Sequence, residues 1–185
     1  MVKDNLVFGV RERPEAFSQK LSIEEDELLR NREAWFAPGH DRRCDFWLEF
    51  ENGVKMLVEN VWNTFTISAF DMARLVDDIG SPWVGVHLDI GNQMRWGVAE
   101  HWVEVLGKRT GKLDVKEYNL DKAMKEGMRK AFDTPLGEGS IRWAAVRAEL
   151  AKINFTGWAA AEVKAGDWPY LADVARRMDQ VLDLR

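Results

Sequence analysis

The sequence has little of several residue types that carry particular functions. Among its 185 residues Cys44 is the only cysteine, so no disulfide can form within the chain. No apolar run is long enough to cross a bilayer, and the first residues lack the apolar stretch of a signal peptide. Positive charge is not in excess either, since the formal net charge is −5 and Lys and Arg are mixed with Asp and Glu. We therefore expect a cytoplasmic protein that binds neither nucleic acid nor membranes.

The remaining composition, 46% hydrophobic and 31% charged, is typical of one globular domain. From residue 54 onward, short apolar runs alternate with segments of helical period, which indicates consecutive βα units and a parallel sheet. The runs that predict strands cover residues 54–62, 82–90, 112–118 and 157–163. The segments that predict helices cover residues 68–80, 98–107, parts of 119–132, 141–153 and 167–184. The fold class is therefore α/β, with about four βα units.

Residues 1–53 give a weaker pattern, which we interpret as an irregular, mostly helical N-terminal segment. Ser22 predicts a helix over 22–36, with Glu25 at the capping-box position. The stretch 45–53 fits either a helix that ends at Gly53 or a hairpin that turns at Asn52-Gly53. We expect this segment to cap or complete the sheet that follows.

Nine tryptophans are unusual for this length. Most of them, such as Trp62, Trp102 and Trp158, lie in apolar runs, where large amphipathic rings usually fill a core. We assign them no catalytic role.

Each of the four apolar runs carries a carboxylate near its C-terminal end: Glu59, Asp89, Asp114 and Glu162. In parallel βα folds these ends form the active-site face, so the four side chains are expected to converge. Converging carboxylates repel one another unless a cation or a proton intervenes, and oxygen ligands favour Mg²⁺ or Mn²⁺ over zinc. A single acidic residue at a strand end is more often a cap or a turn former. Four carboxylates, each at the end of a different strand, favour a metal site.

Further polar residues near these strand ends are candidates for binding substrate. His87 shares the face of Asp89, and Asn92 and Arg95 follow that strand, where they are positioned to meet hydroxyl or phosphate groups. The plainer alternatives are a hydrogen-bonded core histidine and a turn-forming asparagine. Lys116 lies two residues after Asp114, so on a strand both side chains face the inner side. There Lys116 would either neutralise Asp114 or contact the substrate.

Five motifs resemble, in order, the C-terminal half of one enzyme family over about residues 51–183. They read "VENVWN", "LDIGNQMRWG", "LGKRTGKLDVKEYN", "LGEGSIRWAAVRAELAKINFTGWAAAEV" and "YLADVARRMDQVL". The chain is similar here to sugar phosphate isomerases and epimerases, the xylose isomerase-like TIM barrel group that includes L-ribulose-5-phosphate 3-epimerases, hexulose-6-phosphate isomerases and ketose 3-epimerases. The resemblance implies a partial (β/α)₈ barrel formed by residues 54–185.

The resemblance also implies an activity and its residues. Glu59 and Glu162 would be an acid/base pair that moves a proton at a ketose or ketose phosphate, and both would bind a divalent metal, Mn²⁺ or Mg²⁺, together with Asp89. Asp114 stands where the family has a metal-binding histidine, and we count it as a fourth ligand. The family places a similar "GEG" on the active-site face, which makes Glu138 a candidate substrate contact.

Two departures from the family support a second hypothesis. Aspartate in place of histidine adds negative charge to the site. Four strands are half of a barrel of about 250 residues, and they leave open sheet edges that a homodimer would cover. The alternative function is therefore an inactive, truncated family member that serves as a binding or oligomerisation module. A related endonuclease fold fits less well, because the chain has only three histidines and an acidic balance.

Overall fold

The computed structural model describes residues 55–62 and 64–184. The chain divides into two units, residues 1–48 and 49–185, and the description below concerns the second of these. The predictions for residues 1–53 lie outside the described residues.

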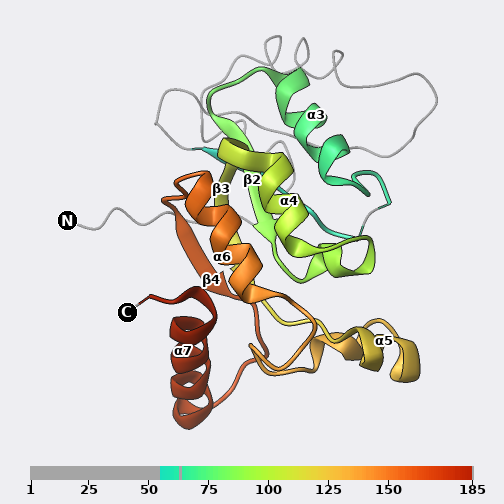
Figure 1. Ribbon diagram of the computed structural model, residues 1–185, viewed down its shortest axis with the longest axis vertical. Coiled ribbons are helices and arrows are strands. Elements are labelled where there is room, and N and C mark those ends of the chain that lie inside the picture. Colours follow the sequence, from blue (N-terminus) through green and yellow to red (C-terminus); the bar gives the residue numbers. More distant parts are fainter. Residues whose placement is uncertain (1–54, 63, 185) are drawn as a thin grey trace, which may run out of the picture. The chain divides into compact units, whose positions relative to one another are not determined.

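A four-stranded parallel sheet is the centre of the described part (Figure 1). Its strands are β1 (Met56–Glu59), β2 (Val84–Asp89), β3 (Thr110–Val115) and β4 (Trp158–Ala161). They lie side by side in chain order, and each neighbouring pair is parallel. β1, β2 and β4 fall within the apolar runs that predict strands, and β3 overlaps its run but begins two residues earlier, at Thr110. The C-terminal ends of the strands therefore meet at one end of the sheet, as the sequence pattern requires.

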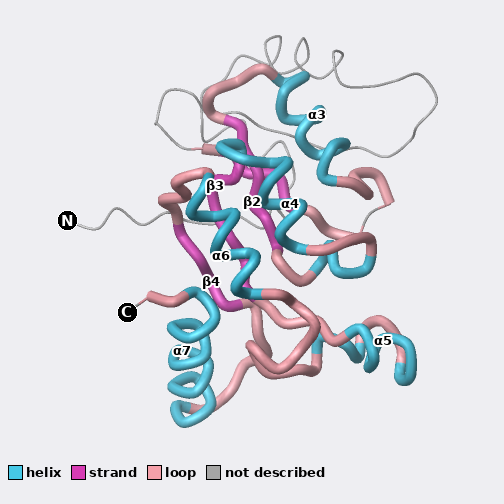
Figure 2. The backbone as a smooth tube through the Cα atoms, viewed as in Figure 1, coloured by secondary structure: helices cyan, strands magenta, loops and turns pink. Residues whose placement is uncertain are grey.

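Helices connect the strands (Figure 2). The helices are α3 (Ala69–Ile79), α4 (Ala99–Leu106), α5 (Leu120–Glu126), α6 (Trp143–Lys152) and α7 (Trp168–Leu182). Three short 3₁₀ turns are η1 (Asn92–Arg95), η2 (Gly107–Arg109) and η3 (Lys130–Phe132). Every predicted helical segment from residue 68 onward is confirmed, and 119–132 is helical in part as expected.

The ends of α3 show how local sequence sets these boundaries. The Ser68 hydroxyl accepts a hydrogen bond from the Asp71 backbone, and the Asp71 carboxylate accepts one from the Ser68 backbone. This capping box satisfies two N–H groups that have no partner within the helix. At the other end Gly80 has φ of 64°, a left-handed conformation that a side chain would disfavour. Both boundaries were predicted from the sequence.

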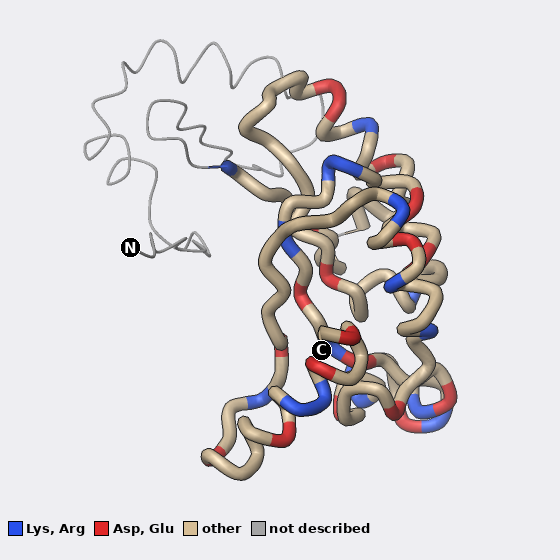
Figure 3. The backbone as a smooth tube through the Cα atoms, turned by 60° about the vertical axis from the view of Figure 1, so that its left-hand side comes forward, with Lys and Arg blue, Asp and Glu red and all other residues tan. Residues whose placement is uncertain are grey.

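The core lies between the sheet and the helices on one of its faces. Val86 and Leu88 of β2 are fully buried, as are Met72 of α3 and Leu106 of α4. In Figure 3 these helices lie to one side of the strands, and consecutive helices α3–α4, α4–α6 and α6–α7 pack against each other. A parallel sheet with its crossover helices on one face is the arrangement of half a (β/α)₈ barrel. The predicted fold class is confirmed.

The opposite face of the sheet corresponds to the inside of a barrel. Near the N-terminal ends of the strands Leu57 packs over Gly85 and Gly111. A Cβ atom on Gly111 would collide with the leucine, and one on Gly85 would collide with the carbonyl oxygen of Arg109 and press on the leucine. The pairing of β2 with β3 shifts between Val86 and His87, which leaves Gly111 as the extra residue of a bulge. The two glycines thus give Leu57 the space to fill the bottom of this face.

The expectation that Trp158 fills the core is wrong. Its side chain is 63% exposed, and β4 is an edge strand that pairs only with β3 among the described strands. Trp102 and Trp143 are buried, as expected. In the part of the chain that the structure describes, no helix is both long and apolar enough to cross a membrane.

Candidate active site

Strand register places the predicted site residues in rows on the inner face of the sheet. Glu59 is in register with His87, and Asp89 is in register with Asp114. Glu162 follows β4 directly, and its backbone N–H donates to the carbonyl oxygen of Val115. Because alternate residues of a strand face the same side, these side chains all project toward the interior.

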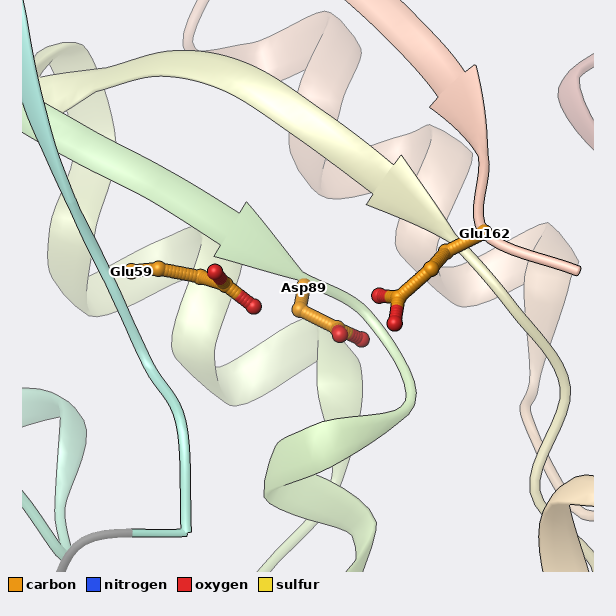
Figure 4. A group of neighbouring side chains, drawn as sticks. All are labelled: Glu59, Asp89 and Glu162. Atoms are coloured by element: carbon orange, nitrogen blue, oxygen red, sulfur yellow. The ribbon is translucent and has the colours of Figure 1, made fainter. Parts of the chain in front are cut away.

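Three of the four predicted metal ligands come together. Glu59, Asp89 and Glu162 each offer a carboxylate oxygen, and these oxygens all lie within 4.8 Å of one another. Figure 4 shows the three side chains pointing toward one another from β1, β2 and the end of β4. We call these residues the carboxylate triad. Glu59 is half-buried, Asp89 is fully buried and Glu162 is exposed.

Asp89 is the most tightly held member of the triad. Its Oδ1 accepts hydrogen bonds from the backbone N–H groups of Gly91 (2.8 Å) and Asn92 (3.0 Å), where the chain turns away from the strand. Its backbone is held from β1, because the Asn60 side chain accepts from the Asp89 N–H at 2.7 Å and donates to its carbonyl at 2.9 Å. Burial raises the pKa of Asp89 to about 7, although Lys116 opposes this. The other oxygen, Oδ2, lies 2.7 Å from Nζ of Lys116.

Lys116 places a positive charge within the triad. Its Nζ lies 2.7 Å from Oδ2 of Asp89 and 2.8 Å from Oε2 of Glu162, and 4.8 Å from the ring centroid of Phe132. Burial lowers the pKa of Lys116, but the two carboxylates outweigh this and hold the pKa above its ordinary value. The prediction that Lys116 faces inward is confirmed, but its partners are Asp89 and Glu162 rather than Asp114.

Asp114 has a different set of partners. Its Oδ2 lies 2.9 Å from Nε2 of His87, and its Oδ1 lies 3.0 Å from Nζ of Lys112. Burial raises the pKa of Asp114, but His87 and Lys112 outweigh this and hold the pKa below its ordinary value. The structure thus joins Asp114 to His87 and Lys112 and does not group it with the triad.

Glu59 is the second triad carboxylate whose ionisation is disfavoured by burial. Burial raises its pKa, and although His87 lowers it, the pKa stays above the usual range of a glutamic acid. The Asn92 side chain amide is 3.5 Å from Oε1 of Glu59, at the limit of a hydrogen bond. A carboxylate with a raised pKa is better suited to accepting a proton near neutral pH than an ordinary glutamate.

The other predicted substrate contacts are divided between two places. Asn92 and Arg95 belong to η1, directly beyond Asp89, and the Arg95 guanidinium stacks on the rings of Trp62 and Trp96 at 5.0 and 4.2 Å. Glu138, in contrast, has its Oε1 2.7 Å from Nη1 of Arg177 on α7. The structure therefore gives Glu138 a partner on the last helix.

Three residues important to the site were missed in the sequence. Asn60 joins β1 to Asp89, and Lys112 neutralises Asp114. Glu117 is buried, and its carboxylate accepts hydrogen bonds from Gly137 N (2.8 Å), Ile141 N (3.3 Å) and Nε1 of Trp143 (2.9 Å). The available signal was a polar or charged residue within an apolar run, which at each of these positions requires a partner if it is buried.

The triad suits a divalent cation. All its donors are carboxylate oxygens, which hard cations such as Mg²⁺ and Mn²⁺ prefer. When the three carboxylates are ionised, one charge is balanced by Lys116 and the remaining two match a divalent ion. Oδ2 of Asp89 is fully buried, and its partner within the described part of the chain is the Lys116 ammonium at 2.7 Å, which a bound cation would replace or share.

Comparisons with known proteins identify the family of this half barrel. The family model described as "Xylose isomerase-like TIM barrel" matches residues 44–182. The chain belongs to this family. No curated protein matches the sequence. The family assignment confirms the resemblance drawn from the five motifs.

Solved structures of xylose isomerase-like barrels show the same fold at low sequence identity. A xylose isomerase domain protein from Planctomyces limnophilus is 18% identical, with a TM-score of 0.54. An L-ribulose 3-epimerase is 15% identical (TM-score 0.54), and a D-tagatose 3-epimerase-like protein is 22% identical (TM-score 0.55). Each comparison covers 71% of this chain, but only 45%, 48% and 48% of the respective structure. The chain thus spans less than half the length of these barrels.

Proposed function

We propose that the protein is a metal-dependent isomerase or epimerase of a ketose or ketose phosphate. The observation that supports this most directly is the carboxylate triad, in which two glutamates from β1 and β4 flank the buried Asp89. Two of the similar structures are named as a ketose 3-epimerase or as similar to one. A triad of this kind at the C-terminal ends of parallel strands is where a barrel enzyme carries out its chemistry.

Each residue of the triad has a role in this proposal. Glu59, Asp89 and Glu162 would hold Mn²⁺ or Mg²⁺, which when bound would stabilise negative charge on a substrate oxygen. One glutamate removes the proton from the carbon next to the carbonyl, and the other returns a proton from the opposite side. Glu59, whose pKa is raised, is suited to the accepting role. Asp114 as a fourth ligand gains no support, because His87 and Lys112 take up its oxygens.

Two measurements test the function. Mn²⁺ should raise the melting temperature of the protein, and ketoses or ketose phosphates should exchange the C3 proton with D₂O in its presence. Glu59→Gln and Glu162→Gln should abolish exchange, whereas Glu104→Gln, an exposed glutamate of α4, should leave it unchanged. If wild-type protein shows neither stabilisation by Mn²⁺ nor exchange, the proposed enzyme function is wrong.

The second candidate is an inactive binding or oligomerisation module. The observation in its favour is Lys116, whose ammonium already contacts two of the three triad residues. The same measurements separate the candidates, because an inactive module would catalyse no exchange under any metal condition. In either case we propose a cytoplasmic protein, and a homodimer in which a second copy covers the open edge of β4.

A further inference from the structure

A hollow of about 440 Å³ lies beside the site and has no role in the proposal above. It is lined by Trp62, Arg95 and the segment 126–130. Trp62 follows β1, Arg95 follows β2, and the segment 126–130 belongs to the connection that follows β3. All three come after the C-terminal ends of strands, so the hollow opens on the same end of the sheet as the carboxylate triad. Its volume falls within the range of about 300–1,000 Å³ of small-molecule sites.

The lining of this hollow is basic, although the protein as a whole is acidic. Arg95, Arg129 and Lys130 contribute positive charge, and Glu126 is the one acidic residue that lines it among those described. No carboxylate in residues 55–62 or 64–184 forms a salt bridge with Arg95 or Arg129, and Lys130 has only a long contact of 3.5 Å to Asp133. Unpaired guanidinium groups around one hollow favour an anionic ligand.

Arg95 is held in place before any ligand binds. Its guanidinium lies over the rings of Trp62 and Trp96, and the Trp62 ring is itself fixed by a hydrogen bond of 2.7 Å from its Nε1 to the carbonyl oxygen of Asn92. Stacking uses the flat faces of the guanidinium and leaves the N–H groups at its edge free to donate. A preorganised donor of this kind loses less entropy when it binds an oxyanion.

An aromatic contact connects the hollow to the triad. The ring of Phe132 lies 5.3 Å from the Trp62 ring, and it is the same ring over which the Lys116 ammonium lies at 4.8 Å. Asn92 also contacts both, through its backbone to Trp62 and through its side chain toward Glu59. A ligand that extends from the triad past Phe132 would therefore bring its far end toward Arg95.

We propose that this hollow binds the phosphate group of the substrate, so that the substrate class is a phosphorylated ketose rather than a free sugar. This inference rests on the proposed isomerase or epimerase function, since it concerns the far end of the same substrate. Arg95 and Arg129 donate to the phosphate oxygens, and Lys130 adds positive charge. The carbonyl end of the sugar lies at the triad.

Binding of inorganic phosphate to the 185-residue chain tests the subsite without requiring activity. Calorimetric titration in metal-free, low-salt buffer should show saturable binding, and Arg95→Gln or Arg129→Gln should weaken it about tenfold each. Arg74→Gln, an exposed arginine of α3, is the matched control and should bind like wild type. Absence of saturable binding overturns the inference, and so does an equal effect of Arg74→Gln and Arg95→Gln.

The C3 exchange assay separates a failure of the phosphate subsite from a failure of the proposed enzyme function. Arg129→Gln should raise the KM for a ketose phosphate about tenfold more than the KM for the free ketose, whereas Arg74→Gln should leave both unchanged. Equal effects on both substrates, or faster exchange of the free ketose by wild type, overturn the phosphate subsite while the enzyme function stands. Saturable phosphate binding without any exchange supports an anion subsite and overturns the enzyme function.

Discussion

At the scale of single residues, the ammonium of Lys116 decides how strongly the triad attracts a metal. Its Nζ lies 2.7 Å from Oδ2 of Asp89 and 2.8 Å from Oε2 of Glu162. A metal ion bound by the triad would need the same two oxygens. We predict that Lys116→Met increases the affinity for Mn²⁺ roughly tenfold, because three carboxylates then lack a competing positive charge. Titration of Mn²⁺ followed by calorimetry measures this directly.

The same substitution has an opposite effect on the metal-free protein. Removing Lys116 leaves the fully buried Asp89 without its cation, which costs about 3–5 kcal/mol of unfolding free energy. Lys112→Met is the control, because Lys112 pairs with Asp114 outside the triad and its removal should leave the Mn²⁺ affinity near wild type. Weaker Mn²⁺ binding by Lys116→Met would show that the lysine supports the metal site and does not compete for it.

The sequence predicts which residues face the site but not how their side chains pair. Strand parity was enough to place Glu59, Asp89 and Glu162 on the inner face, since each ends an apolar run. Asp114 has the same parity and stands in register with Asp89, yet it turns to His87 and Lys112. The pairing depends on which cation lies within reach, and that distance is set by the register between strands, which a single sequence does not reveal.

At the scale of elements, Glu117 fixes the connection that leads into α6. Its buried carboxylate accepts hydrogen bonds from Gly137, Ile141 and Trp143, and it packs so closely on Gly139 that a Cβ atom there would collide with it. The second glycine of the "GEG" motif, Gly139, is therefore required because a side chain there would collide with the buried carboxylate of Glu117. Its Glu138 pairs with Arg177.

We predict that Glu117→Gln lowers the unfolding free energy by about 3 kcal/mol, because the amide NH₂ group would face N–H donors with no acceptor between them. Urea unfolding followed by tryptophan fluorescence measures the loss. Glu104→Gln, on the exposed face of α4, is the control and should change stability by less than about 0.5 kcal/mol. A loss for Glu117→Gln no larger than that of the control would contradict the role of Glu117 as the anchor of this connection.

Elements were predictable where the signal is local. Ser68, Asp71 and Gly80 specify both ends of α3 through contacts within a few residues of each other. The bulge at Gly111 was not predictable, because it depends on Leu57 packing from another strand. The exposure of Trp158 was missed for the same kind of reason, since an apolar residue in a strand is buried only if a neighbouring element covers it.

At the scale of the whole molecule, the sheet is half of a barrel with two strand edges. Among the described strands β1 pairs only with β2 and β4 only with β3, so each has one side without a strand partner. A two-fold axis along the barrel would place β4 of one copy beside β1 of the other, twice, and keep all eight strands parallel. The exposed ring of Trp158, which has the inward parity of Glu162, would then be covered.

We predict that the 21.3 kDa chain forms a homodimer and that Trp158→Glu dissociates it, because a buried, unpaired carboxylate at the junction costs several kcal/mol. Light scattering after size-exclusion chromatography measures the mass of each form. Met124→Glu is the control, because Met124 is 86% exposed on α5, away from both strand edges, and its replacement should leave the dimer intact. A monomeric wild type, or a Trp158→Glu protein that remains dimeric, would contradict pairing through these edges.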